Sequence, residues 1–304
     1  MGGSEEALAV SVRRWPVLGR RRWPFSPGGT LLLAASAPIF LYLLLPTLVV
    51  VPMALTPKPL LEFPPSGLSL RPFRDLFHDA AWMSAGVVSV KVALLAVSIA
   101  CVVATMAALA LHSARFAGKG IIQAIILVPI VAPLIVLALA DYEFLVNFHL
   151  TGTWVGIGLS HSVLATPYFF VALQASLAGL DPALVRSARS LGAGTMSVFR
   201  HVYLPALRPG LAAGALFAFI ASFDETVIAL FQQGPQATTL PVKMFTDIQY
   251  ELSPKIAAVA ALLVGLATLV FLTQTAILLG RRSQAQAPAP AGGRRPRAER
   301  GRVG

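Results

Sequence analysis

The sequence has few charged residues and almost no cysteine. Only 12% of its 304 residues are Asp, Glu, Lys or Arg, against about 25% in an average soluble globular protein. With 56% hydrophobic residues, this composition is typical of a polytopic membrane protein rather than a soluble enzyme. The single cysteine, Cys101, excludes a disulfide framework and a cysteine metal site within one chain.

The sequence also lacks the phosphate-binding loop G-x-x-x-x-G-K-[ST] of many ATPases. The segment Ala-Gly-Lys-Gly at 117–120 has the wrong spacing for that loop. His161 has no partner at the spacing of a metal site or a catalytic triad, so we expect it to make a polar contact between helices. We therefore predict that the chain is not an enzyme and carries no catalytic residue, metal site or cofactor of its own.

Long apolar runs, by contrast, are abundant. A hydrocarbon core about 30 Å thick is crossed by about 20 helical residues, and the sequence contains several runs of that length. We predict an all-α protein with six transmembrane helices, over the approximate ranges 31–53, 82–112, 121–141, 154–176, 208–231 and 256–280.

The positive charges follow this predicted topology. Most of the 24 Lys and Arg residues lie in the two tails and in two of the connecting segments, which six spans would place on one side of the membrane. The positive-inside rule then puts both termini in the cytoplasm. The charge lies at membrane edges without an aromatic-studded basic face, so we expect no nucleic-acid partner.

Three regions lie outside the predicted spans. Residues 1–30 form a basic cytoplasmic tail, and residues 281–304 form a low-complexity basic tail that we expect to be disordered and cytoplasmic. The loop over 54–81 is rich in proline, which breaks helices. We expect it to be an extended cap on the periplasmic face.

One polar segment, DPALVRSARSLGAGTMSVFRHVYLP at 181–205, is set between two membrane-length runs. Asp181 followed by Pro182 is a helix start signal, because the carboxylate accepts from free backbone amides and proline has no amide to satisfy. The glycines at 192 and 194 can end that helix. Within it, three apolar residues recur at helical spacing: Leu184, Ala188 and Leu191.

A second short helix is predicted over 195–203, with Val198, Phe199 and Val202 on one side, and we expect Pro205 to stop it. The two helices and their glycine turn fit either of two interpretations. They can be an amphipathic loop at the membrane interface. They can also be a docking element that inserts into a partner and moves the flanking spans.

The segment resembles the cytoplasmic coupling loop of ABC importer permeases. That pattern is Glu-Ala-Ala, three residues, Gly, nine residues, Ile, one residue, Leu-Pro, and every spacing is kept here. The matching positions are Arg186, Ser187, Ala188, Gly192, Val202, Leu204 and Pro205. The departure is the triplet itself, which reads Arg-Ser-Ala here, with Arg186 at the position of the acid. Either the ATPase presents an acidic or neutral surface there, or the contact is made otherwise; our hypothesis is a compensating acidic residue on the partner ATPase.

A second resemblance covers SFDETVIALF at 222–231, TLPVKMF at 239–245 and ELSPKIAAVAALL at 251–263. These segments are similar to the second permease component of spermidine/putrescine-type importers. The whole resemblance extends over about residues 82–280, with the first helix as an addition. It implies the type I ABC importer permease (MetI-like) fold and transport of a polyamine or a related organic cation.

The resemblance also implies partners and a location. The partners are ABC ATPase subunits that use ATP and Mg, a second permease subunit and an extracytoplasmic substrate-binding protein. The location is the bacterial inner membrane, with multiple spans through the lipid. On this reading the ATPase-coupling residues are Asp181, Pro182, Arg186, Ser187, Ala188, Leu191, Gly192, Val202, Leu204 and Pro205.

Asp224 and Glu225 are carboxylates at membrane depth, a costly position that commonly faces a cavity or a partner. They can pair within the bundle, for instance with Lys91, or they can line a water-filled path and attract an amine, together with Phe223. An alternative class, a stand-alone ion-coupled secondary transporter, would use Asp224, Glu225 and Lys91 as an ion relay, and it leaves the 181–205 spacing unexplained.

Two further features of the sequence bear on helix packing and helix ends. Asp141 and Glu143 end the third predicted span, and we expect them at its outer rim. The small-residue spacings Gly152 to Gly156 and Gly210 to Gly214 suit close helix packing.

Overall fold

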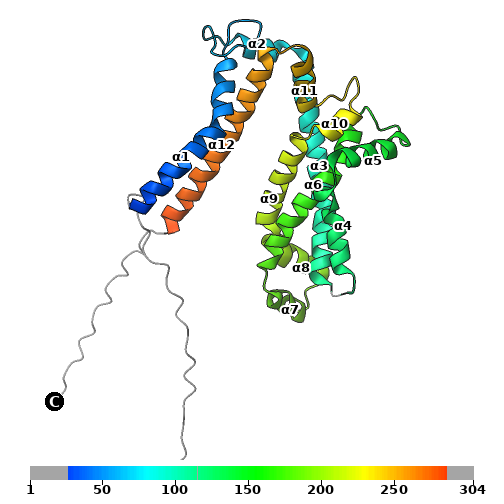
Figure 1. Ribbon diagram of the computed structural model, residues 1–304. Helices are drawn as coiled ribbons and strands as arrows, with labels where there is room; N and C mark the ends of the chain where they lie inside the picture. Colours follow the sequence, from blue (N-terminus) through cyan, green and yellow to red (C-terminus); the bar gives the residue numbers. More distant parts are fainter. Residues whose placement is uncertain (1–26, 115, 286–304) are drawn as a thin grey trace, which may run out of the picture. The chain divides into compact units, whose positions relative to one another are not determined.

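The computed structural model describes residues 27–114 and 116–285 of the chain. Within these ranges the protein is all-helical, without a strand (Figure 1), which confirms the predicted fold class. Residues 1–26 of the predicted N-terminal tail and 286–304 of the predicted C-terminal tail lie outside the described residues, whereas residues 27–30 begin α1 and residues 281–285 end α12, so both tails are shorter than predicted. The chain divides into two compact units, residues 1–50 and 51–304, and each is described by itself.

The whole described part of the first unit lies in α1 (Pro27–Met53). In its described residues the second unit contains eleven α-helices and one π-helical turn. Their bounds are α2 (Arg71–His78), α3 (Ala80–Ser113), α4 (Lys119–Val131), α5 (Leu134–Val146), α6 (Trp154–Ala178), α7 (Pro182–Ser190), α8 (Thr195–Val198), η1 (Phe199–Tyr203), α9 (Leu204–Phe223), α10 (Val227–Gln232), α11 (Leu240–Tyr250) and α12 (Pro254–Ala285).

The structure does not confirm six membrane spans. In the described part of the chain, four helical stretches are long and apolar enough to cross a membrane, and a fifth is added if a bent pair of helices counts as one span. The four stretches are Gly29–Met53, Ala80–Ser113, Trp154–Ala178 and Thr195–Phe223. Three of the predicted spans, 31–53, 82–112 and 154–176, correspond directly to helices among these.

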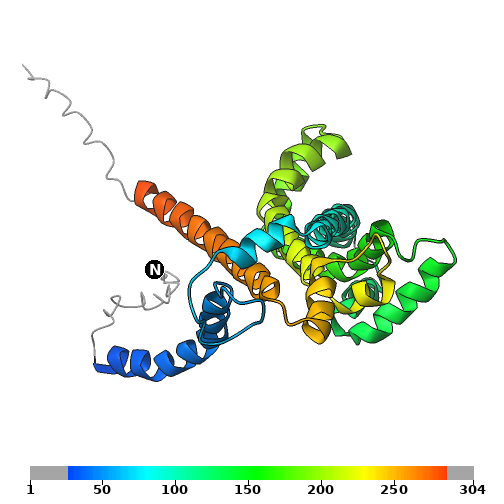
Figure 2. The same ribbon diagram turned by 90° about the horizontal axis from the view of Figure 1, so that it is seen from above.

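The third predicted span, 121–141, consists of two helices rather than one. α4 and α5 meet at an angle of 103°, because Pro133 has no amide to donate and keeps Ala132 in an extended conformation at ψ 140. Figure 2 looks down the bundle and shows α3 nearly end-on, whereas α5 lies across the view. Hydropathy alone missed the bend because both helices are apolar.

The last two predicted spans also differ from the structure. The fifth, 208–231, is interrupted where α9 ends at Phe223 and α10 begins at Val227. The sixth, 256–280, falls on α12, whose described apolar stretch Pro254–Val270 is shorter than a span.

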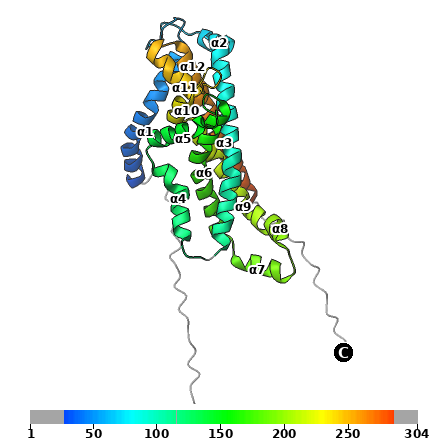
Figure 3. The ribbon, with the colours of Figure 1, turned by 90° about the vertical axis from the view of Figure 1, so that its right-hand side faces the viewer.

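The core of the second unit is a packed bundle of α3, α6 and α9 (Figures 1 and 3). Small side chains on α3 form a buried seam against large ones on α6, which lets the helix backbones approach closely. The seam consists of Ala96, Ala100, Ala104 and Ala108, and the α6 residues are Phe169, Phe170 and Leu173.

Glycines on α9 continue this close packing, as predicted for Gly210 and Gly214. A methyl group on Gly210 would meet the backbone oxygen of Ala172 at 2.8 Å, and one on Gly214 would meet Cδ1 of Phe169 at 2.8 Å. The second predicted pair differs: Gly152 faces the backbone of Gly234 in a loop, outside any helix.

As predicted, the proline-rich segment before α3 does not form one continuous helix. Its last part nevertheless forms a short helix, α2. Glu62 organises the non-helical part, because its carboxylate accepts from Lys58 Nζ at 2.6 Å and from the backbone of Ser66 at 2.9 Å. The Lys58 ammonium, followed by Ser66, lowers the pKa of Glu62 to about 2.

A salt bridge joins the beginnings of α3 and α12. Asp79 caps α3 by accepting from the amide of Ala81 at 3.0 Å, and its other oxygen accepts from Lys255 Nζ at 2.6 Å. The hydrogen bond from Lys255 lowers the pKa of Asp79 below its usual value, against the opposing effect of partial burial.

Candidate functional site

The segment 181–205, here called the docking segment, begins as the sequence predicts. Asp181 accepts from the amide of Ala183 at 2.8 Å, and Pro182 opens α7. Gly192 ends this helix in the left-handed conformation at φ +82, which favours glycine. The amide of Gly192 donates to the carbonyl of Arg189 at 2.9 Å, which satisfies part of the helix end.

The face of α7 that packs on the bundle differs from the predicted one. Val185 and Ala188 contact the core, whereas Leu184 and Leu191 have 55% and 89% of their surface exposed. Ala188 belongs to both apolar faces of this short helix, so the spacing alone could not select between them. Arg186 and Ser187 are also exposed.

The second half of the docking segment runs directly into α9. Val198 is buried, and Phe199 and Val202 are half-buried against the core, which confirms that these three residues share a side. The predicted stop at Pro205 is wrong, because Thr195–Phe223 forms one helical stretch. A π-helical turn stands just before the proline, with the amide of Leu204 donating to the carbonyl of Phe199.

This end of the bundle is fixed by Tyr203. Its ring is buried, and its hydroxyl lies 3.2 Å from Oγ of Ser113 at the end of α3. The docking segment is therefore firmly seated on α3 while it leaves three large apolar side chains, Leu184, Leu191 and Met196, exposed.

A second polar site lies at the break between α9 and α10. The three residues Asp224, Glu225 and Thr226 separate the helices, and Glu225 closes the gap. Its Oε1 accepts from the amides of Val227 at 2.8 Å and Ile228 at 3.0 Å, and its Oε2 accepts from Ala229 at 3.1 Å. Glu225 thus satisfies the free amides at the start of α10.

His161 of α6 contacts this break from the bundle interior. Its Nδ1 lies 2.9 Å from Oγ of Ser222. Its Nε2 lies 3.2 Å from Oε2 of Glu225, close but not aligned as a hydrogen bond. The predicted polar interhelical contact of His161 is confirmed, but sequence reasoning missed its partners, and the only signal was a lone histidine inside a span.

Lys91 lies beside an aromatic ring and does not pair with Asp224 or Glu225. Its Nζ lies 6.0 Å from the ring centroid of Trp154, and the ion pair of Glu225 is with His161. Glu225 therefore pairs within the bundle, as one of the two alternatives held, but its partner is His161 and not Lys91.

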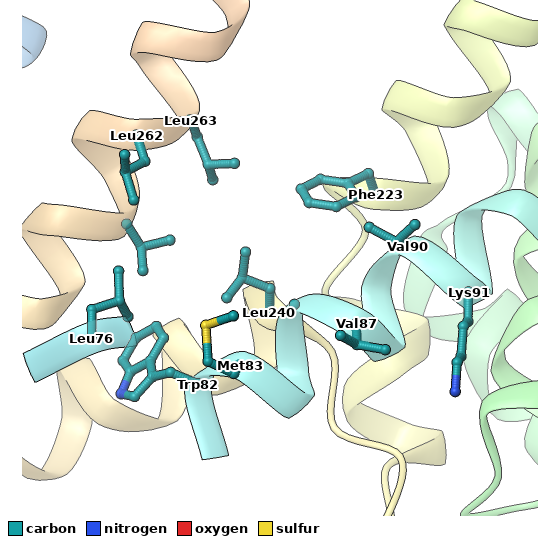
Figure 4. A pocket seen from close by; sticks show the side chains of 12 residues that line it. Leu76, Trp82, Met83, Val87, Val90, Lys91, Phe223, Leu240, Leu262 and Leu263 are labelled. Carbon is teal, nitrogen blue, oxygen red and sulfur yellow. The ribbon is translucent and has the colours of Figure 1, made fainter. Parts of the chain in front are cut away.

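The three residues predicted to line a substrate path, Phe223, Asp224 and Glu225, line two different cavities. Asp224 is exposed and, with Glu225, lines a cavity of about 400 Å³ beside Tyr168. Phe223 stacks on Phe219 with ring centroids 5.5 Å apart. It lines a different cavity of about 450 Å³, whose walls are apolar except for Lys91 at one end (Figure 4).

Asp141 and Glu143 also differ from each other. Glu143 is exposed, whereas Oδ2 of Asp141 is buried, and the Asp141 carboxylate lies beside Ser160. Asp141 therefore faces the bundle rather than the rim position expected for both residues.

Comparison with known proteins gives consistent results. The family described as "Binding-protein-dependent transport system inner membrane component" matches residues 100–283. The putrescine transport system permease protein PotI of Escherichia coli K12 is 33% identical over 207 residues, which cover 66% of this chain and 74% of that protein. The spermidine/putrescine transport system permease protein PotC of Haemophilus influenzae is 29% identical over 212 residues, 68% of this chain and 81% of that protein.

A solved structure shares the fold. It is that of a bacterial ABC transporter involved in the import of the acidic polysaccharide alginate, and it matches with a TM-score of 0.64 at 13% identity, covering 83% of this chain and 98% of the other. This likeness confirms the expected ABC importer permease fold. Since the family match covers more than half of the chain, this multi-pass protein belongs to the inner membrane components of binding-protein-dependent transport systems.

Proposed function

We propose that this permease carries a polyamine such as putrescine or spermidine, or a related organic cation, and couples to a separate ATPase through the docking segment. The names of the relatives PotI and PotC support the substrate class. The absence of a phosphate-binding loop from the sequence agrees with ATP and Mg being used by the partner.

The main support for the coupling proposal is that the docking segment exposes large apolar side chains although other residues of the same segment pack firmly in the bundle. Leu191 is 89% exposed and Met196 74% exposed, although Val198 and Tyr203 of the same segment are buried. Fully burying one such side chain against a partner contributes about 1.5–3 kcal/mol. Arg186, Ser187 and Arg189 are exposed on the same helix, and the spacing of the ABC coupling-loop pattern favours an ATPase as the partner over a lipid interface.

The charge at Arg186 sets a requirement on the partner. Arg186 is exposed and stands at the position of the acid in the coupling-loop pattern that the segment resembles, so the ATPase is proposed to present an acidic residue to it. Arg186→Glu should then weaken assembly and transport with the native ATPase. Unchanged or improved transport by this variant would refute the acidic partner.

Asp224 is the proposed contact for the cationic substrate. It caps the C-terminal end of α9 and is exposed, so its carboxylate and the negative end of the helix dipole would both attract an ammonium group. Glu225 is already engaged with three amides and with His161, so its proposed role at the path is to hold the backbone beside Asp224.

The remaining parts of the proposal concern assembly and orientation. Two ATPase subunits, a second permease and a substrate-binding protein complete the importer, with both termini in the cytoplasm and the loop 54–81 on the periplasmic side. A stand-alone ion-coupled transporter is less well supported, because Lys91 lies at Trp154 and Glu225 lies at His161.

The test is reconstitution of the complex with its ATPase and its binding protein in liposomes. We expect the ATPase to co-purify with the permease, and labelled putrescine or spermidine to accumulate only with ATP. Asp224→Asn should abolish uptake and leave assembly and basal ATPase activity unchanged. A permease that transports alone under an ion gradient would refute the coupling, and a binding protein that takes an anion or a sugar would refute the substrate class.

A further inference from the structure

The break between α9 and α10 is bridged by one buried imidazole. His161 touches Ser222, the residue before Phe223 at the end of α9, at 2.9 Å. It also touches Glu225, the residue that closes the start of α10, at 3.2 Å. The side chains of His161 and Glu225 are 0% and 3% exposed, so water does not compete for these contacts.

His161 comes from a helix that is fixed relative to α9. α6 and α9 pack so closely that a methyl group on Gly210 or Gly214 of α9 would overlap atoms of α6. Helices in such contact cannot shift past each other without a steric clash. The His161 imidazole therefore keeps its position relative to α9, and both sides of the break contact it.

Asp224 lies between the two contacts. Its neighbours in sequence are Phe223 and Glu225, and its own side chain is exposed beside the cavity of about 400 Å³. In the described part of the chain, no ion pair or side-chain hydrogen bond fixes the Asp224 carboxylate itself. Its direction must then come from the backbone, which Ser222 and Glu225 hold on either side.

We infer that His161 is the positioning residue of the break: by holding Ser222 and Glu225 at once, it fixes where the carboxylate of Asp224 faces the cavity. The inference rests on the proposed role of Asp224 at the substrate path. At the break itself His161 is the shared partner, because Glu225 accepts from α10 amides and pairs with His161, and Ser222 has its side-chain hydrogen bond with His161. The other polar link from α6 to α10, from Gln232 Nε2 to Ser160 Oγ at 2.5 Å, lies at the far end of α10.

The test measures the position of residue 224 without any substrate. Cys101 is the only cysteine, so Cys101→Ala with Asp224→Cys gives a single thiol in the chain. The assembled complex is labelled with a positively charged methanethiosulfonate reagent, and the labelling rate of this chain is followed by mass spectrometry. His161→Leu removes both polar contacts, and Ser222→Ala removes one.

Ser162→Ala is the matched control. Ser162 follows His161 on α6, is buried, and donates only to the carbonyl of Leu159 in its own helix at 2.6 Å. Its removal should leave the labelling rate within about twofold of the parent, because the break is untouched.

We expect His161→Leu to change the labelling rate of residue 224 by at least about fivefold, and Ser222→Ala to change it in the same direction by less. His161→Gln, whose amide can still donate towards Glu225, should restore part of the parent rate. If His161→Leu does not assemble, Ser222→Ala decides. Rates within about twofold of the parent in every assembled variant at these two positions, or an equal change in Ser162→Ala, overturn the inference.

The uptake assay separates this inference from the proposed function. Wild-type putrescine uptake by Asp224→Asn would remove Asp224 from the path and leave the labelling result standing. Loss of uptake in Asp224→Asn with unchanged labelling in the His161 and Ser222 variants would overturn the positioning role alone.

Discussion

The contact between α6 and α9 offers a quantitative test of the bundle. We predict that Gly210→Ala destabilises the protein more than Gly265→Ala. At Gly210 the new methyl group would lie 2.8 Å from the backbone oxygen of Ala172 and closer still to Oγ of Ser176. The serine hydroxyl can rotate away, but the carbonyl belongs to the backbone of α6 and cannot move without the helix. At Gly265 on α12 the methyl group would meet no atom within 4 Å.

The expected magnitude follows from two opposing effects. Overpacking a close contact costs about 1–3 kcal/mol, and a contact against backbone belongs near the upper end of that range. Alanine is favoured over glycine in a helix interior by about 1 kcal/mol. The net loss for Gly210→Ala is about 2 kcal/mol, whereas Gly265→Ala should gain up to about 1 kcal/mol.

The assay is thermal unfolding of the purified complex in detergent. At about 2–4 °C per kcal/mol for a chain of this size, Gly210→Ala should lower Tm by roughly 4–8 °C, and Gly265→Ala should leave it unchanged or slightly raised. A Tm for Gly210→Ala equal to or above that of the parent would show that α6 and α9 do not touch at this point, and the reasoning about close packing would fail.

Three further predictions concern the two ends of the bundle. Leu191→Asp should abolish co-purification of the ATPase without lowering Tm, since this side chain is 89% exposed and makes no core contact; retained co-purification contradicts its docking role. Asp181→Ala removes the cap on α7 and should cost about 0.5–2 kcal/mol of local helix stability. Hydrogen exchange of the α7 amides should then be faster than in the parent, whereas in Asp181→Asn, which can still cap the helix, it should stay close to the parent rate. The Asp79 carboxylate has a lowered pKa in the folded state, so its contribution to stability is present above its unfolded pKa and is lost as the pH falls through the folded pKa. Lys255→Met should reduce the acid dependence of Tm without removing it, because the amides of Ala81 and Trp82 still lower the pKa of Asp79; an unchanged acid profile would show that the 2.6 Å pair contributes nothing.

Local chemistry in the sequence predicted part of this fold well. The start of α7 at Pro182 follows from Asp181, whose carboxylate caps the helix, and its end follows from the left-handed Gly192. The all-α class follows from long apolar runs. These features depend on residues adjacent in sequence, so no knowledge of tertiary contacts was needed.

Features set by direction or by distant partners were harder to predict. The apolar run 121–141 does not reveal that Pro133 turns the chain by 103°, because hydropathy carries no information on direction. The pairing of Glu225 with His161 joins α6 to the α9–α10 break. Lys91 was the more obvious partner by charge, but only the packing of α6 on α9 decides which basic side chain lies near.

The unbroken helical stretch Thr195–Phe223 has a mechanical consequence. Its 29 residues span about 43 Å at 1.5 Å per residue, and no loop interrupts them between the docking segment and the α9–α10 break. Pro205 has no amide to donate, and the π-helical turn at Phe199–Tyr203 accommodates it, so the helical stretch continues through the proline. A tilt of about 10° about one end therefore displaces the other end, which adjoins Asp224, by about 8 Å.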